Sequence, residues 1–495
     1  MMYKNYKRFG ALFIICMAML LGLKPDAVAN KVHKEKGEKP NILFILADDL
    51  GWADVNIFDP KHRGYYETPN IDRLARQGMM FTQAYSNAAN CSPSRAALMS
   101  GQYYPHQPIY HVGSPGQGKL IPAHNATDLP LDKVTLAEAL KQGGYQTGFI
   151  GKWHIGDPPK TGPKQQGFDI NIGGYNAGNP RGWEGGYFKP NNNPYINDAK
   201  DGEYLTDYLT RKAQRYITKH KKGPFYLQLS FYTPHSPYQA PETLVQKYKQ
   251  KKAVGGHNHP VYAAMIEKLD RNVGKLMQTL KDQGIERNTI VFFFSDNGGR
   301  GGYGYLGHAD NNITDNSPLK GGKTTYYEGG IRVPLIVRWP EVIEPGSKTK
   351  TPVISTDFYP TLVEAAGIGR PEHYLLDGQS LLPLFKNPEY TFNDRDLYWH
   401  FPGYPNFIWR TGPVSVIRKG NWKLLKFYED FYQTGEVEIY NLNRDLSETQ
   451  NVTNQNPGMR RKLKNKLEIW LEEYDAPTPK IRNELNNKST VRKNH

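Results

Sequence analysis

Polar side chains that could do chemistry directly follow several apolar runs of the sequence. Four of them offer oxygen ligands: Asp48 and Asp49 follow NILFILA, and Asp296 and Asn297 follow TIVFFFS. Adjacent carboxylates repel each other unless a cation neutralises them. Three carboxylates and one amide suit Ca²⁺ or Mg²⁺ and are poor ligands for zinc. The two pairs together predict a metal site, although Asp48 and Asp49 alone would also fit a surface turn.

The stretch NCSPSRAALMSG places a cysteine at the expected start of a helix. Pro93 suits an early helical position, and apolar residues follow it. A helix N-terminus attracts anions and stabilises a thiolate. Arg95 lies one turn after Cys91 on the same helix face, where its guanidinium could bind an oxyanion or hold the group that Cys91 becomes. A buried, inert thiol is the alternative.

Further candidates for acid–base and anion-stabilising roles come from three separate segments. Lys152 and His154 follow YQTGFIG, His235 follows PFYLQLSFYTP, and Lys323 lies in the glycine-rich stretch GGKTTYYEGG. Histidines serve as general acids or bases, and lysines stabilise developing negative charge. Each of these residues alone is more often structural or solvated. Their occurrence together after apolar runs favours one shared site.

Two other stretches could contact a sugar. His308 and Asp310 lie in GYLGHADNNITDN, which could line a sugar pocket or form plain surface. The insert Gly173–Tyr195 is rich in tyrosine, tryptophan and asparagine. Aromatic faces with polar groups nearby suit sugar binding, and an irregular loop is the alternative.

The elements that must position these residues alternate between strands and helices. Apolar runs without polar alternation are typical of strands buried on both faces. TPNIDRLARQG predicts a helix with Thr68 as cap and Gly78 as its end, and Thr135 with Glu138 predicts a capping box. Such alternation predicts an α/β fold with a mostly parallel sheet between helices. The carboxyl ends of its strands would gather the candidate residues.

The sequence predicts four regions. Residues 1–29 form a signal peptide, 30–385 a catalytic domain, 386–475 a small α+β domain of antiparallel strands with a closing helix, and 476–495 a flexible basic tail. The signal has a basic start, an apolar run Phe9–Leu23 and a small-residue cleavage site at Ala27–Ala29. A membrane anchor is the alternative, but this run is shorter than the roughly 20 residues that span a bilayer.

Export would leave Cys91 as the only cysteine, because Cys16 lies in the signal peptide. The chain has a net charge of +15, and removal of four positive and one negative residue with the signal leaves +12. Such a charge favours a polyanionic partner. An acidic polysaccharide is favoured over nucleic acid, since the sequence has no nucleic-acid-binding motif. A basic surface that serves only solubility is the alternative.

Several motifs are similar to those of the type I sulfatases, which depend on formylglycine. CSPSRAALMSG and GYQTGFIGKWHIG resemble the two signatures of that family, and ILADDLGWADV, TPHSPY, SDNGG and GGKTTYYEGGIRVP match its other blocks in order. The resemblance covers about residues 40–385 and continues more weakly at GNWKLLKF and VEIYNL. It implies an alkaline-phosphatase-like fold and a relation to bacterial polysaccharide sulfatases.

The resemblance also implies a modified nucleophile and one bound ion. A maturation enzyme would oxidise Cys91 to formylglycine (3-oxoalanine), whose aldehyde hydrates to a gem-diol. One Ca²⁺ would be held by the diol at position 91 together with Asp48, Asp49, Asp296 and Asn297.

The residues can be assigned hypothetical roles in sulfate ester cleavage. The diol oxygen would attack sulfur as Asp296 takes its proton, and the anion would be stabilised by Arg95, Lys152 and Lys323. His235 or Lys323 would protonate the leaving oxygen, and His154 would then deprotonate the remaining hydroxyl to expel sulfate.

The sequence therefore predicts a periplasmic or secreted, calcium-dependent sulfatase without a membrane segment after cleavage. The expected substrate is a sulfated oligo- or polysaccharide of algal type, ulvan or carrageenan, with glycosaminoglycans second. A phosphoester or phosphonate hydrolase of the same superfamily and a non-catalytic carbohydrate-binding protein are the alternatives.

Overall fold

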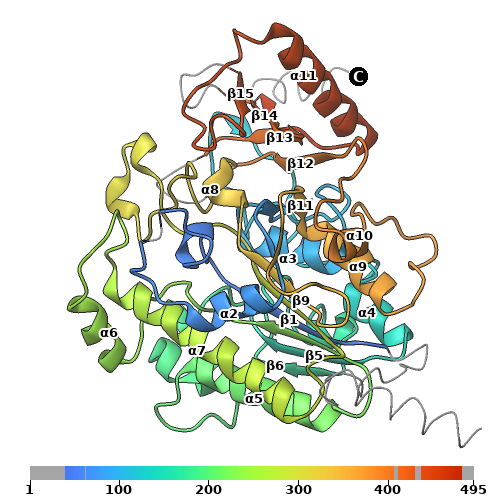
Figure 1. The fold of residues 1–495 in the computed structure, drawn as a ribbon. Helices are drawn as coiled ribbons and strands as arrows, with labels where there is room; N and C mark the ends of the chain where they lie inside the picture. Colours follow the sequence, from blue (N-terminus) through green and yellow to red (C-terminus); the bar gives the residue numbers. More distant parts are fainter. Residues whose placement is uncertain (1–38, 62, 406–410, 430–435, 482–495) are drawn as a thin grey trace, which may run out of the picture. The chain divides into compact units, whose positions relative to one another are not determined.

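The computed structural model describes residues 39–61, 63–405, 411–429 and 436–481, which belong to one compact unit beginning at Lys39 (Figure 1). The predicted signal peptide and residues 482–495 of the predicted tail lie outside the described residues.

The main sheet has eight strands in the order β10-β2-β9-β8-β1-β7-β5-β6. Their bounds are β1 Asn41–Ala47, β2 Met79–Phe81, β5 Gln146–Gly151, β6 Ile170–Ile172, β7 Phe225–Ser230, β8 Thr289–Ser295, β9 Leu335–Arg338 and β10 Ser347–Thr349. Strands β8, β1, β7, β5 and β6 are parallel, whereas β9 runs antiparallel to both β8 and β2. The predicted mixed, mostly parallel sheet is confirmed.

Helices cover both faces of this sheet, because successive residues of its buried strands point to opposite faces. In β1, Leu43 and Ile45 enter one core and Ile42 and Phe44 the other. The helices of the first core are α2 Pro69–Gln77, α5 Leu205–His220, α6 Glu242–Lys249 and α7 Pro260–Asp282. Those of the second are α3 Cys91–Ser100, α4 Leu136–Gln142, α9 Phe358–Ala365 and α10 Leu382–Lys386. Figure 1 shows α5 and α7 on one side of the strands and α4 and α9 on the other.

The two predicted helix caps have different outcomes. The capping box of α4 is confirmed, since Glu138 N donates to Thr135 Oγ1 (3.2 Å) and Thr135 N to Glu138 Oε2 (2.7 Å). Thr68 and Gly78 flank α2 as its N-cap and C-cap residues, as predicted, but Thr68 Oγ1 accepts no hydrogen bond from this helix. The buried Asp270 of α7 accepts instead from the backbone N–H groups of Asn70 (2.9 Å) and Ile71 (2.8 Å). A carboxylate from a distant helix thus replaces the local cap.

A second, antiparallel sheet follows the main one, as predicted. It consists of β12 Asp396–Phe401, β13 Val414–Lys419, β14 Trp422–Phe427 and β15 Val437–Asn441. Its closing helix α11, Pro457–Glu473, shares a core with it. Short pairs also join β3 Ala84–Tyr85 to β11 Val353–Ile354 and β4 Leu120–Ile121 to β16 Lys480–Ile481.

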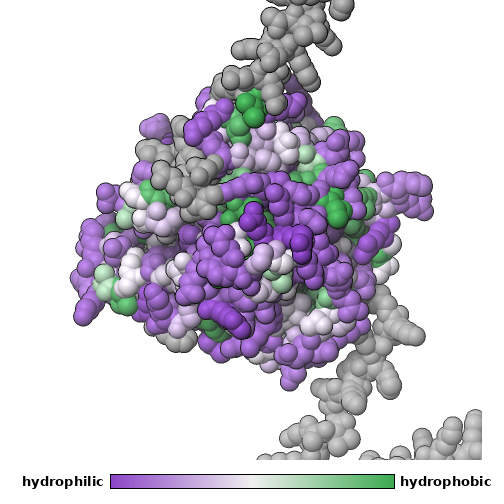
Figure 2. All heavy atoms as spheres, turned by 90° about the horizontal axis from the view of Figure 1, so that it is seen from above, coloured by the Kyte–Doolittle hydropathy of each residue, from purple (hydrophilic) through white to green (hydrophobic). Residues whose placement is uncertain are grey.

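The surface seen in Figure 2 is largely hydrophilic, and its hydrophobic residues lie in separate small groups. Among the helices that the structure describes, none combines the length and apolar character needed to span a membrane.

A buried charge cluster joins the second sheet to the main body. Lys423 of β14 lies 3.0 Å from Glu328 Oε1 and 2.9 Å from Glu448 Oε1, and all three side chains are fully buried. Glu328 begins the short helix α8, Glu328–Ile331. Burial raises the pKa of Glu448, and the positive charge of Lys423 opposes that effect.

We expect Lys423→Met to lower the free energy of unfolding by about 3–5 kcal/mol, because two buried carboxylates lose their common partner. Since these carboxylates would then hold protons more tightly when folded than when unfolded, stability should fall as pH rises above about 4.5, so the loss is larger at pH 8 than at pH 5. Urea unfolding measures both effects.

Lys426→Met is the matched control on the same strand. Its partner Glu468 is exposed, so the free energy of unfolding should change by at most about 1 kcal/mol. Equal losses in the two variants would contradict the role of Lys423.

Candidate active site

The two acidic residues after β1 lie at its carboxyl end and are buried. Asp49 has a φ of 64°, a left-handed conformation uncommon for residues other than glycine. Its backbone is held by neighbouring elements, because Asp49 N donates to Asp296 Oδ1 (3.1 Å) and Tyr262 Oη of α7 donates to Asp49 O (3.2 Å). Ser295 Oγ accepts from the next amide, Leu50 N (3.0 Å). This conformation directs the Asp49 carboxylate toward Cys91.

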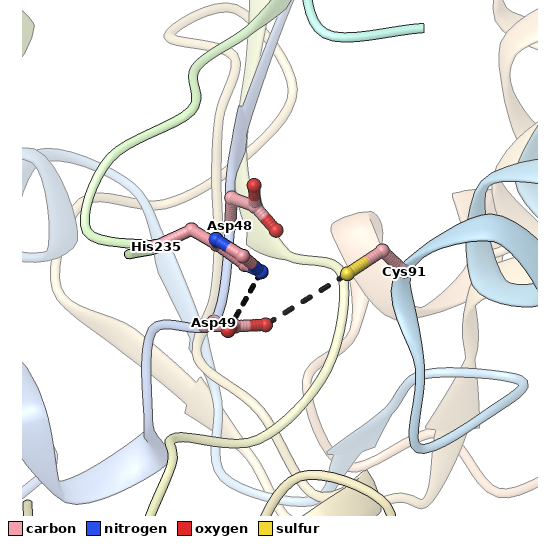
Figure 3. A group of neighbouring side chains, drawn as sticks. All are labelled: Asp48, Asp49, Cys91 and His235. Carbon is pink, nitrogen blue, oxygen red and sulfur yellow. Dashed lines mark hydrogen bonds and ion pairs between the residues drawn. The ribbon is translucent and has the colours of Figure 1, made fainter. Parts of the chain in front are cut away.

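Cys91 is the first residue of α3, as predicted, and the helix is buried over its whole length. Its Sγ lies 3.4 Å from Lys323 Nζ and 3.9 Å from Asp49 Oδ1. Figure 3 shows the thiol pointing at Asp49, with His235 on the other side of that carboxylate. A side chain at this helix N-terminus is therefore placed between a carboxylate and an ammonium group.

Three carboxylates of the site each accept hydrogen bonds from one cationic side chain, and Arg95 also lies 3.8 Å from Asp48 Oδ1. Asp48 Oδ2 accepts from Lys152 Nζ and Asp49 Oδ2 from Lys323 Nζ, both at 2.7 Å. The third pair, between Asp296 Oδ2 and Arg95, has distances of 2.9 Å to Nε and 2.7 Å to Nη2. All these groups are buried, so each carboxylate needs such a partner.

A cavity of about 320 Å³ opens over this cluster. The described residues that line it are Asp49, Asn90, Cys91, Val112, His154, Gly178, Asn179, Arg181, His235, Ser236, Arg300, Lys323 and Thr324. Of the residues predicted from sequence, Cys91, His154, His235 and Lys323 thus reach one cavity together with Asp49. Its volume lies at the lower end of the range for small-molecule sites, about 300–1,000 Å³.

Other predicted residues lie elsewhere. Arg95, Lys152 and Asp296 belong to the ion pairs and do not line the cavity. His308 and Asp310 were predicted to contact substrate. His308 is half-buried and Asp310 is exposed, and neither is among the lining residues.

Sequence reasoning missed several lining residues, among them Asn90, Val112, Arg181, Ser236 and Arg300. Some had a signal in the sequence, since Ser236 adjoins His235 and Arg300 follows SDNGG. Val112 had none, because only the tertiary fold brings its loop to the cavity.

Burial and neighbouring charges shift the pKa values in this cluster. Burial raises the pKa of Asp48 well above its ordinary value. At Asp49 the positive charges of Lys323 and His235 outweigh burial and lower the pKa. The same ion pair raises the pKa of Lys323 against the effect of burial. Burial, and to a lesser extent nearby cations, lower the pKa values of His154 and His235.

The donor atoms of the cluster fit a hard cation. Ligand atoms of Asp48, Asp49, Cys91 and His235 all lie within 4.8 Å of one another. Asp48 Oδ1 and Asn297 Oδ1 are buried and accept no hydrogen bond from any described residue. Buried oxygens without partners are unfavourable unless another group binds them, and a cation would do so. Three of the five predicted ligands, Asp48, Asp49 and Cys91, belong to this group of neighbouring atoms, and His235 is its fourth member. A fourth predicted ligand, Asn297, has a buried oxygen that accepts no hydrogen bond from any described residue.

Comparisons with known proteins found two matching family models and several similar proteins. A family model described as "Sulfatase" matches residues 40–368, and one described as "N-sulphoglucosamine sulphohydrolase, C-terminal" matches residues 322–475. A protein named "Sulfatase" from Formosa agariphila is 35% identical, with 96% of each chain covered. An N-acetylgalactosamine-6-O-sulfatase from Bacteroides thetaiotaomicron is 29% identical over 88% of this chain and 95% of its own.

Solved structures are similar to this fold as well. The crystal structure of Ps i-CgsB in complex with k-i-k-neocarrahexaose has a TM-score of 0.71 and 31% identity, and covers 92% of this chain and 97% of its own.

Proposed function

Because the chain belongs to the sulfatase family, we propose that it is a calcium-dependent sulfuric ester hydrolase that acts on sulfated carbohydrates through a formylglycine made from Cys91. The observation that carries this proposal is the position of Cys91. It lies at a buried helix N-terminus, within 3.4 Å of a lysine and 3.9 Å of a carboxylate, in the wall of a cavity.

Formylglycine supplies a hydrated aldehyde, whose oxygen is a nucleophile toward sulfur. The side chains around position 91 would orient that oxygen and the sulfate. Lys323 Nζ is near enough to donate to an oxygen bound there. His154 and His235 both line the cavity, so we assign them the proton transfers. His235, or Lys323, would give a proton to the leaving oxygen, and His154 would take one from the second hydroxyl.

Arg95 and Lys152 have a different role in this proposal from the direct sulfate contacts expected from the sequence. Their cationic groups hold Asp296 and Asp48 and so fix the acidic residues in place. We keep Asp296 as the group that takes the first proton, although its Oδ2 accepts from Arg95 in this structure.

One Ca²⁺ is proposed to be held by Asp48, Asp49, Asp296, Asn297 and the oxygen at position 91. Bound there, it would neutralise charge on the sulfuryl oxygens. The oxygen-rich donor set supports calcium over zinc. The same donor set disfavours the second candidate function, that of a zinc-dependent phosphoester or phosphonate hydrolase.

We propose sulfated algal oligosaccharides, of carrageenan or ulvan type, as substrates, with glycosaminoglycans second. The basic charge of the chain supports a polyanion. A similar solved structure contains a neocarrahexaose, and a relative is named for N-acetylgalactosamine 6-O-sulfate. We further propose export to the periplasm or medium after cleavage of residues 1–29, and the domain limits 30–385 and 386–475 given above.

The test is sulfate release by protein co-expressed with a formylglycine-generating enzyme. Ion chromatography should detect free sulfate from defined carrageenan, ulvan or glycosaminoglycan oligosaccharides, and elemental analysis should find calcium. Release of phosphate but no sulfate, with zinc in the protein, would favour the phosphoester hydrolase. Intact-mass analysis that finds only a thiol at Cys91 after co-expression would favour a non-catalytic binding protein.

A glycine beside His154 gives a sharper test of the geometry. A Cβ on Gly178 would lie 2.4 Å from the His154 ring, so Gly178→Ala must displace the imidazole. We expect kcat/KM to fall about 10²-fold with the melting temperature nearly unchanged, because misplacement of a reacting group by about 1 Å has that effect. Gly182→Ala in the same loop is the matched control, since a Cβ there meets no atom within 4 Å. Equal activity of the two variants would exclude a catalytic role of His154 in this position.

A further inference from the structure

Two arginines line the cavity in addition to the groups assigned to the reaction. Arg181 lies in the short helix η4, Pro180–Gly182, within the predicted aromatic insert, and Arg300 follows β8 three residues after Asn297. The insert therefore brings a guanidinium to the cavity from a segment of the chain far from Arg300.

Each arginine is tied to a different part of the site. Arg181 Nη2 donates to Ser236 Oγ (3.3 Å), next to His235, and Gly178 of the same loop packs against the His154 ring. Arg300 follows Gly299, whose carbonyl accepts from Lys323 N (3.0 Å). Arg181 thus belongs to the histidine side of the cavity and Arg300 to the lysine side.

The carboxylates of the site have cationic partners other than Arg181 and Arg300. Below the cavity the three carboxylates Asp48, Asp49 and Asp296 are already matched by three cationic side chains. Asp49 is the one carboxylate among the described residues that line the cavity. Arg181 forms no ion pair with any residue in the described part of the chain, and its donors suit an oxyanion.

A single sulfate ester carries one negative charge, and the groups around Cys91 are sufficient to bind it. We propose that Arg181 and Arg300 form a subsite for a second anionic group of the substrate, a sulfate ester or a carboxylate on the same or the adjoining sugar. The small volume of the cavity, about 320 Å³, requires this second group to lie close to the reacting sulfate. The inference rests on the proposed sulfatase function and specifies its substrate class.

The test compares three oligosaccharides that share one reactive sulfate. The first has no other charge, the second has an additional sulfate, and the third has a carboxylate instead. Matured wild-type protein should show a kcat/KM at least about tenfold higher for the second or the third than for the first, since a charge-assisted hydrogen bond has an effect of that size. The preferred one identifies the source of the anion.

Arg181→Gln and Arg300→Gln should each reduce this preference to less than about threefold, by raising KM for the doubly charged substrate. Arg215→Gln on α5 is the control, because that side chain is 64% exposed. The subsite would be overturned if the wild type had the same kcat/KM for all three substrates. It would also be overturned if both variants lost kcat/KM by the same factor on all three. Either result would leave the sulfatase function intact. Absence of sulfate release from every substrate would overturn both. Calorimetric binding of the same three compounds to Cys91→Ala gives a second readout that does not depend on turnover.

Discussion

Cys91→Ala is expected to abolish sulfate release, with a fall in kcat of at least about 10⁴-fold, because the variant lacks the atom from which the nucleophile is made. Position 91 begins α3 and its side chain has only 2% exposure, but alanine is a small helix former that fits the same space. The folded structure should therefore be retained. Sulfate release and thermal melting of the wild type and the variant measure the two effects separately.

Cys91→Ser distinguishes a formylglycine from a simple nucleophile. A serine hydroxyl that attacked sulfur would form a stable sulfate ester, which water must then cleave. We expect at most one turnover, visible as a sulfated protein by intact mass, and no sustained release. Wild-type protein produced without a maturation enzyme should be as inactive as Cys91→Ala. Sustained activity of either protein would refute the assignment of Cys91 as a precursor.

Removal of calcium is expected to have the second largest effect, with loss of activity by about 10³-fold or more and a lower melting temperature. An ion that binds only the folded protein stabilises it by about 2.7 kcal/mol at 100 times its dissociation constant. The buried oxygens Asp48 Oδ1 and Asn297 Oδ1 would lose their proposed partner. Dialysis against a chelator, followed by activity and melting measurements with and without added Ca²⁺, provides the test.

Two variants control this experiment. Asp48→Asn removes one proposed carboxylate ligand, so calcium should no longer raise its melting temperature. Asp310→Asn alters an exposed carboxylate away from the cavity and should respond to calcium like the wild type. Restoration of the chelated protein by Zn²⁺ but not by Ca²⁺ would favour the alternative hydrolase.

The strands and long helices were predictable because burial on both faces requires apolar runs that remain visible in one sequence. β1 and β8 are examples, since every residue in both is buried. The capping box of α4 was equally local, with its two partners three residues apart. The cap of α2 was not predictable, because its acceptor Asp270 is 200 residues away.

The sequence by itself determined that the residues after β1, β5, β7 and β8 gather near one another, because the carboxyl ends of parallel strands lie at one edge of a sheet. Only the tertiary structure decided how their charges pair. Arg95 is one turn from Cys91 in sequence, yet its guanidinium binds Asp296, and Lys152 binds Asp48. Spacing fixes the element on which a side chain sits, whereas its partner depends on which opposite charge is nearest once water is excluded. Likewise, only the fold shows that Arg181 and Arg300 line the same cavity.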